Sequence, residues 1–309
     1  MSLNVIFMGT PKFSIPALEE LIKSNFNIVA VYTQPPKKSK RGQKINPSPI
    51  EEFSKKKELN FRNPSNLNNN EELKIFKELS PDIVVVVAYG QIIPENFLKI
   101  SKLSFINIHA SLLPKWRGAA PIQRAVMNLD KKTGISIMKI VEKLDAGPIC
   151  NMYSIDINNN ENVENISEKL STLAAEKILD NIEDILEDKV EFEEQKHKEA
   201  TYANKIEKVE GKIDWDHSAE MIIGKINGLY PNPGAWFVYR GERYKVLKAK
   251  ISTGSSKPGT IISDKLEVSC NYNKSIKILE IQRQGKKPQN INEFMLGSQI
   301  KKGTNLKNA

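Results

Sequence analysis

Residues 105–123 read FINIHASLLPKWRGAAPIQ, a short apolar run that leads through a stretch with proline and glycine toward a second apolar run. Residues 105–109 predict a buried β-strand, and residues 119–128 predict a helix after it. Side chains two positions apart on a strand point to the same face. We therefore expect Asn107 and His109 to lie side by side where this strand ends.

The chain before and after this segment alternates strands and helices. Strands rich in Val and Ile are predicted at residues 3–8, 28–33, 83–88 and 135–140, and helices at 16–24, 70–79 and 164–187. The strands are apolar on both faces, as in a buried parallel sheet. This order predicts an α/β domain with a doubly wound, mostly parallel sheet, whose sites lie at the carboxyl ends of its strands.

The pattern changes in the second part of the chain. Residues 195–216 are polar and predict a linker along the surface. Five short strands then follow between Gly and Pro residues, at 235–239, 243–249, 259–262, 266–269 and 276–282. This spacing predicts a small C-terminal β-barrel, for which an OB-like fold is one candidate. We expect one domain over residues 1–203, including the start of the linker, and a second over residues 204–309.

Length and composition exclude several classes of protein for this chain. The 309 residues are enough for two domains, and no apolar run approaches the roughly 18 residues that span a bilayer. The N-terminus predicts a first core strand, not a signal peptide. Cys150 and Cys270 are far apart and lack nearby metal-ligand partners, so we expect reduced thiols, no metal site and a cytoplasmic protein. The turn after the first strand, MGTPKFS, lacks GxGxxG, which argues against a dinucleotide site.

A second segment supplies a carboxylate. Residues 134–149, GISIMKIVEKLDAGPI, carry Asp145 into a turn with Gly147 and Pro148. If this strand neighbours the first, Asp145 can reach His109, stabilise the charged imidazole and hold its orientation. Taken singly, the histidine could be a core residue and the aspartate a turn former. Together, amide, imidazole and carboxylate predict a centre that stabilises an oxyanion and moves protons.

These residues also carry a family resemblance. NxHxSLLPxxRG followed by LDAGPI resembles the 10-formyltetrahydrofolate-dependent formyltransferases and hydrolases. The resemblance implies that Asn107, His109 and Asp145 surround the transferred formyl carbon, and that 10-formyltetrahydrofolate is the co-substrate, with no metal. It further implies that the reduced folate is bound by residues from three loops, namely Ser111, Leu112, Leu113 and Pro114, then Ala88, Tyr89, Gly90, Gln91 and Ile92, and finally Leu144 and Gly147.

The resemblance extends along the chain. FMGTPKFSIPAL near the start, ATYANKIEKVEGKIDW at 200–215, YPNPGAWF at 230–237 and ILEIQRQGKKP near the end are similar to the family members that formylate methionine on initiator transfer RNA. The acceptor implied is the α-amino group of methionyl initiator transfer RNA, which serves translation initiation. The C-terminal domain is then expected to hold the RNA, and the protein to be a monomer.

Charge is consistent with an RNA partner. The net charge of +9 and the pI near 9.2 indicate a polyanionic partner, although a general richness in lysine could give the same values. Residues 34–49, QPPKKSKRGQKINPSP, hold five basic residues and no acidic one, and their prolines favour an irregular loop. By family analogy this loop contacts RNA through Lys37, Lys38, Lys40, Arg41 and Lys44, with Arg41 the most important. The alternative is a solvated loop in a lysine-rich protein.

Two other functions remain open. One is formylation of an amino sugar on a nucleotide carrier, which would use the same three residues. The other is an RNA-binding module on a catalytically inactive folate fold, against which the intact Asn107, His109 and Asp145 argue. A folate-hydrolysing relative would use the same residues with water.

Overall fold

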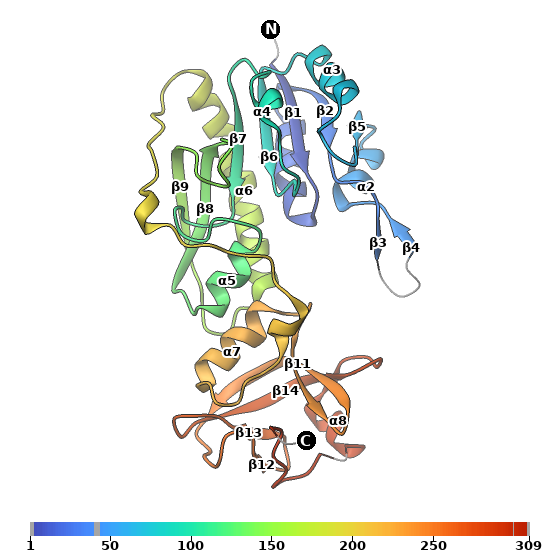
Figure 1. Cartoon of the computed structure of the whole chain (residues 1–309), viewed down its shortest axis with the longest axis vertical. Coiled ribbons are helices and arrows are strands. Elements are labelled where there is room, and N and C mark those ends of the chain that lie inside the picture. Colours follow the sequence, from blue (N-terminus) through green and yellow to red (C-terminus); the bar gives the residue numbers. More distant parts are fainter. Residues whose placement is uncertain (1–2, 40–43, 299, 308–309) are drawn as a thin grey trace. The chain divides into compact units, whose positions relative to one another are not determined.

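The computed structural model describes residues 3–39, 44–298 and 300–307, and the statements below concern these residues. They form two compact units (Figure 1). The first unit runs to Pro121 and adds Thr133–Ile155 and Ser167–Ala203. The second unit comprises Ile122–Lys132, Asp156–Ile166 and the chain from Asn204 onward.

A seven-stranded sheet of order β5-β2-β1-β6-β7-β8-β9 organises the first unit. Its strands are β1 (Asn4–Gly9), β2 (Asn27–Tyr32), β5 (Phe61–Arg62), β6 (Ile83–Val87), β7 (Ser104–His109), β8 (Lys132–Lys139) and β9 (Ile149–Asp156). The first five strands in this order, β5, β2, β1, β6 and β7, run parallel to one another. The predicted α/β class with a mostly parallel sheet is confirmed.

Three details of this sheet differ from the prediction, the first being the two-residue strand β5, which was not predicted. Strand β8 pairs antiparallel with β7, so it is not one of the parallel strands, because an apolar run shows burial but not direction. Strand β9 was not predicted, since its exposed and less exposed side chains alternate at the edge of the sheet and leave no apolar run. Both strands matter for the site, because Asp145 belongs to the segment of chain that connects β8 to β9.

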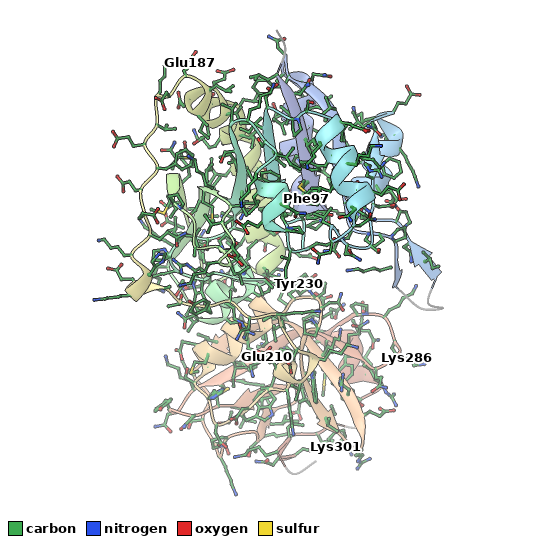
Figure 2. The ribbon with its side chains drawn as sticks, turned by 45° about the horizontal axis from the view of Figure 1, so that its top comes forward. Phe97, Glu187, Glu210, Tyr230, Lys286 and Lys301 are labelled. Atoms are coloured by element: carbon green, nitrogen blue, oxygen red, sulfur yellow. The ribbon has the colours of Figure 1, made fainter. Side chains whose placement is uncertain are left out.

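The helices of the first unit are α1 (Ile15–Lys23), α2 (Pro49–Lys56), α3 (Asn70–Glu78), α4 (Glu95–Leu98) and most of α6 (Val163–Leu186), with 3₁₀ turns η1 (Lys12–Ser14) and η2 (His197–Glu199). Helix α5 (Pro121–Met127) falls almost entirely in the second unit. Helix α2 was not predicted; Ser48 caps it by accepting from the Glu51 amide at 2.9 Å. Phe76 packs against the rings of Tyr32, Phe97 and Phe105 in the core (Phe97 is labelled in Figure 2). None of the described helices is long and apolar enough to cross a membrane.

The basic segment is more regular than expected. Strands β3 (Lys37–Ser39) and β4 (Lys44–Asn46) pair antiparallel, so the expectation that prolines keep residues 34–49 out of strands is wrong. Pro35, Pro36 and Pro47 flank the paired residues and do not interrupt them, so each strand keeps its backbone donors.

An antiparallel sheet of order β10-β11-β14-β13-β12, with β15 on β14, forms the second unit. Its elements from Asn204 onward are β10 (Ala235–Tyr239), β11 (Glu242–Ser252), β12 (Ile261–Ser263), β13 (Glu267–Ser269), β14 (Ser275–Arg283), β15 (Gln289–Asn290), α7 (Ala219–Gly228) and α8 (Ile291–Leu296), with the 3₁₀ turn η3 (Lys208–Gly211). All five predicted strands are present, and the sheet is that of a small barrel-like domain.

Helix α7 was not predicted, because two glycines lower its intrinsic helix propensity. Their packing explains why they are there. A Cβ atom at Gly228 would lie 2.5 Å from Met127 Cγ, and one at Gly224 would lie 2.8 Å from a methyl group of Leu129. The helix therefore approaches residues 127–129 too closely for any side chain at these two positions.

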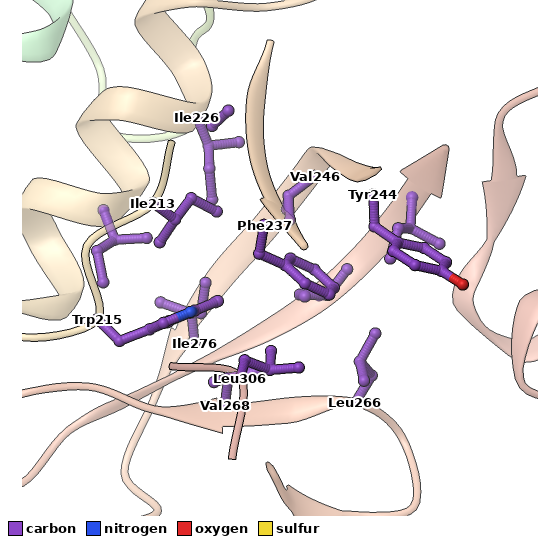
Figure 3. Close-up of a cluster of buried hydrophobic side chains, with 14 of the residues drawn as sticks. Ile213, Trp215, Ile226, Phe237, Tyr244, Val246, Leu266, Val268, Ile276 and Leu306 are labelled. Carbon is purple, nitrogen blue, oxygen red and sulfur yellow. The ribbon is translucent and has the colours of Figure 1, made fainter. Parts of the chain in front are cut away.

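Aromatic rings pack among aliphatic side chains in the core of the second unit (Figure 3). Phe237 stacks on Tyr244 with ring centroids 5.5 Å apart, and Trp215 lies 6.1 Å from Phe237. Trp236 is also buried; its indole nitrogen donates to the Lys208 carbonyl, and Arg243 covers its ring. Both tryptophans therefore serve packing in this structure.

Removing the central ring tests this core. Phe237→Ala should destabilise the second unit by about 3–5 kcal/mol, because the cavity loses both transfer energy and ring contacts. Denaturant unfolding followed by tryptophan fluorescence, in a Trp116→Phe background, reports on Trp215 and Trp236. The control Leu296→Ala removes a side chain that is 91% exposed and should change stability by no more than about 0.5 kcal/mol. Equal losses from the two variants would contradict the assignment of Phe237 to the core.

Candidate active site

His109 occupies the end of β7 with both ring nitrogens facing oxygen atoms. Its Nε2 lies 2.9 Å from the Trp116 carbonyl, and since a carbonyl only accepts, this nitrogen carries a proton. Its Nδ1 lies 3.7 Å from Asp145 Oδ2, an ion-pair distance that is longer than a hydrogen bond. The ring is 7% exposed, so the sequence-predicted histidine and aspartate meet at a largely buried position.

Asn107 lies two residues before His109 on the same strand, opposite Val86 of β6 and Met138 of β8. The side chain is half-buried. Within residues 3–39, 44–298 and 300–307, no hydrogen bond occupies its amide group, whereas most buried polar groups are paired. The amide is therefore available to donate to a bound molecule.

The segment that carries Asp145 leaves the sheet away from His109 and then turns back toward it. Lys139, at the end of β8, pairs with Ile106, so the chain leaves β8 at the beginning of β7, away from His109. The following residues lead back toward the ring, where Asp145 Oδ2 accepts from the Gly118 amide at 2.8 Å. Asp145 has a φ of +46°, in the left-handed region, which costs a residue other than glycine about 1–3 kcal/mol.

The loop after β6 is held rigidly by its neighbours. Ala88 and Gly90 have positive φ angles of 50° and 78°. The Tyr89 ring is buried, and its carbonyl accepts from Thr10 Oγ1 at 2.7 Å and from Gln34 Nε2 at 2.9 Å. Thr10 thus braces this loop. The side chains that remain accessible here include Ile92, which is 90% exposed.

The SLLP segment after β7 is fixed to β8. Ser136 Oγ donates to the Ser111 carbonyl at 2.7 Å and accepts from the Leu113 amide at 3.0 Å. The Ser111 hydroxyl donates to the Lys115 carbonyl, and Leu113 packs against Met138 and Ile149. Leu112 and Pro114 are half-buried, and Leu144 is exposed.

Two residues of the site, Trp116 and Gln195, were not singled out from the sequence, and Arg117 was noted only as part of the motif, without a role. Trp116 contributes its backbone carbonyl, which no sequence pattern reveals. Gln195 is 6% exposed and donates to the carbonyls of Asp145 and Gly147, although it belongs to a segment predicted as a surface linker. Arg117 is 1% exposed and donates to Gln195.

The two cysteines are free and unsuited to nucleophilic chemistry. Burial raises the pKa of Cys150 to about 11 and that of Cys270 to about 12, which favours the neutral thiol. Among the described residues, no group of three or more His, Cys, Asp or Glu side chains is placed to hold a metal ion.

The basic residues are described only in part. Lys37 is exposed, and its ammonium group donates to the Gln34 side chain. Lys38 and Lys44 lie in β3 and β4, but their side chains are outside what the structure describes. Lys40 and Arg41 lie outside the described residues.

Both units match one family of proteins. Residues 1–182 match the family described as Formyl transferase, and residues 205–299 match the family described as Formyl transferase, C-terminal domain. The chain belongs to the formyl transferase family.

Two similar sequences and one solved structure show which members of the family the chain resembles. The chain is 60% identical over 309 residues to the methionyl-tRNA formyltransferase of Pelagibacter ubique (strain HTCC1062), covering 100% of both chains. It is 40% identical over 310 residues to that of Caldanaerobacter subterraneus subsp. tengcongensis, covering 99% of this chain and 100% of the relative. A solved N-formyltransferase from Helicobacter canadensis, in complex with folinic acid and dTDP-3-aminofucose, has a TM-score of 0.70 at 18% identity, covering 90% of this chain and 99% of that one. That structure shares the fold.

Gly147 offers a test of the turn that carries Asp145. A Cβ atom there would lie 2.0 Å from the Lys139 carbonyl oxygen, so Gly147→Ala must shift the backbone. We expect a loss of about 1–3 kcal/mol in the free energy of unfolding, measured by chemical denaturation. Gly297→Ala is the matched control, since a Cβ atom at Gly297 would meet nothing within 4 Å. An unchanged stability of Gly147→Ala would show that this close approach is wrong.

Proposed function

We propose that this protein transfers the formyl group of 10-formyltetrahydrofolate to the α-amino group of methionine on initiator transfer RNA, in the cytoplasm, for translation initiation. The observation that carries the proposal is the meeting of His109 and Asp145 at the end of β7, beside the available amide of Asn107. The full-length similarity to methionyl-tRNA formyltransferases supports the choice of acceptor.

Asn107, His109 and Asp145 have different roles in the transfer of the formyl group. The uncharged amine attacks the formyl carbon on N10 of the folate, and a tetrahedral oxyanion forms. Asn107 donates to this oxyanion, and the positive charge of the protonated His109 beside it stabilises it. Asp145 stabilises the charged imidazole from the side of Nδ1 and helps to pass a proton from the incoming amine to N10 of the folate. The oxyanion then collapses, the bond between the formyl carbon and N10 breaks, and the protonated N10 leaves as part of tetrahydrofolate. No covalent enzyme intermediate is needed.

The loops around these residues bind the folate. Ala88, Gly90 and Gln91 present backbone groups from the braced turn after β6. The SLLP segment contributes mainly backbone and the half-buried Leu112 and Pro114, because the Ser111 hydroxyl and the Leu113 side chain are used within the protein. The accessible apolar side chains of Ile92 and Leu144 contact the folate from either side.

RNA binding is assigned to two parts of the chain. The basic residues of the β3–β4 segment, with Arg41 foremost, contact phosphates near the acceptor end. The domain over residues 204–309 holds the body of the transfer RNA. We propose that the protein works as a monomer.

A parallel set of acceptors distinguishes this function from its alternatives. The purified protein is incubated with 10-formyltetrahydrofolate and radiolabelled methionyl initiator transfer RNA, methionyl elongator transfer RNA, free methionine or a UDP-linked amino sugar. Formylation of the initiator alone is expected. Formylation of the sugar would keep the folate chemistry and reassign the basic segment. RNA binding without transfer to any acceptor would support the catalytically inactive module.

Asn107→Ala tests the oxyanion role. Loss of one oxyanion donor should lower kcat by about 100- to 1000-fold, measured with both substrates at saturation. Folate binding, followed by isothermal titration calorimetry, should be retained, since the amide acts on the oxyanion. Near-normal turnover with intact folate binding would rule out this role for Asn107.

Arg41→Ala tests the RNA contact. Removing one phosphate contact should weaken transfer RNA binding and lower the slope of log affinity against log salt concentration by about one. Lys77→Ala is the control: Lys77 is an exposed lysine on α3 with the same charge change. The same loss of slope in both variants would mean that general charge, not this segment, attracts the RNA.

A further inference from the structure

Gln195 uses all of its hydrogen-bonding capacity inside the protein. Its Nε2 donates to the Asp145 carbonyl at 3.0 Å and to the Gly147 carbonyl at 2.7 Å. Its Oε1 accepts from Arg117 Nε at 3.0 Å and from Arg117 Nη2 at 2.6 Å. A side-chain amide has two donor hydrogens and two acceptor lone pairs, so none is left for solvent.

Arg117 is the other half of this arrangement. Its guanidinium is buried, and none of the ion pairs found among the described residues includes it. Burying a charge is costly unless it is hydrogen-bonded, and here Gln195 and His197 Nδ1, at 2.9 Å, accept its protons. The Arg117 backbone is fixed as well, because its amide donates to Thr201 and its carbonyl accepts from Ala203. Arg117 is thus held along both its main chain and its side chain.

These contacts close a ring around Asp145. The residue after Arg117 is Gly118, whose amide donates to Asp145 Oδ2. Starting at the carboxylate, the ring runs through Gly118 to the Arg117 side chain, on to Gln195, and back to the Asp145 carbonyl. One connected group of residues therefore forms hydrogen bonds with both the side chain and the backbone of Asp145. Its left-handed backbone conformation needs such support.

We propose that Gln195 and Arg117 are positioning residues, which hold the Asp145 carboxylate at the imidazole of His109 for formyl transfer. This inference rests on the catalytic role proposed for Asp145. Arg117 sets the Gly118 amide from one side, and Gln195 sets the Asp145 and Gly147 carbonyls from the other. A displacement of the carboxylate by about 1 Å would lower turnover by up to about 100-fold, since catalysis depends on the placement of charged groups.

A double-mutant cycle separates positioning from general stability. Gln195→Met keeps the approximate size of the side chain and removes its hydrogen bonds. We expect kcat at saturating folate and transfer RNA to fall by about 10- to 100-fold, with the KM for transfer RNA unchanged. In an Asp145→Asn background the same change should cost no more than about threefold, because the carboxylate that Gln195 positions is already gone.

Gln195→Glu serves as a second variant, in case Gln195→Met does not fold. The carboxylate keeps acceptors for Arg117 and places a negative charge beside the buried guanidinium, so the fold is preserved. It cannot donate to the carbonyls of Asp145 and Gly147. We expect the same loss of kcat as for Gln195→Met.

Asn181→Ala is the matched control. Asn181 is a buried amide of α6 that accepts from Asn151 and donates to Tyr153 and Lys177, and none of its hydrogen bonds with described residues goes to residues 145–148. It should lower the melting temperature like the Gln195 variants and leave kcat within about twofold of the parent.

The outcomes are distinct. Loss of kcat in the Gln195 variants that disappears in the Asp145→Asn background supports the positioning role. An equal loss in both backgrounds, or an equal loss in Asn181→Ala, would overturn it while leaving the proposed function intact. Full turnover of Asp145→Asn itself would instead refute the catalytic role of Asp145, and the positioning role with it.

Discussion

The hydrogen bond from the Gly118 amide to Asp145 Oδ2 joins two segments that leave the sheet from different strands. It requires residues 117–118 to run against residues 201–203, and a Cβ atom at Gly118 would lie only 2.9 Å from the Ala203 carbonyl. Glycine is also needed because φ at this position is +118°. The chain after α6 therefore completes a site that β7 and the Asp145 turn could not form alone.

Local sequence patterns predicted much of the architecture. Apolar runs marked most strands of both sheets, and spacing of two placed Asn107 and His109 on one face. The direction of β8 was beyond such patterns, because both directions bury the same side chains. So was Gln195: a polar residue in a polar segment predicts exposure, and its burial is compensated by four hydrogen bonds whose partners are distant in sequence.

The fold and the reaction centre leave the acceptor undetermined. The N-formyltransferase of Helicobacter canadensis, solved in complex with folinic acid and dTDP-3-aminofucose, shares this fold at 18% identity, and a shared fold alone does not identify the acceptor. In the proposed scheme the choice of acceptor lies outside the three central residues, in the basic segment and the second domain. The proposed positioning residues act on the chemistry at Asp145 and not on the choice of acceptor.

The make-up of the second unit bears on how the chain folds during synthesis. Its segment Ile122–Lys132 contains Met127 and Leu129, which pack against the glycines of α7. On the ribosome this segment leaves the exit tunnel long before α7 has been translated, because synthesis runs from the N-terminus. Residues 122–132 therefore cannot complete their packing in the second unit until α7 has been synthesised.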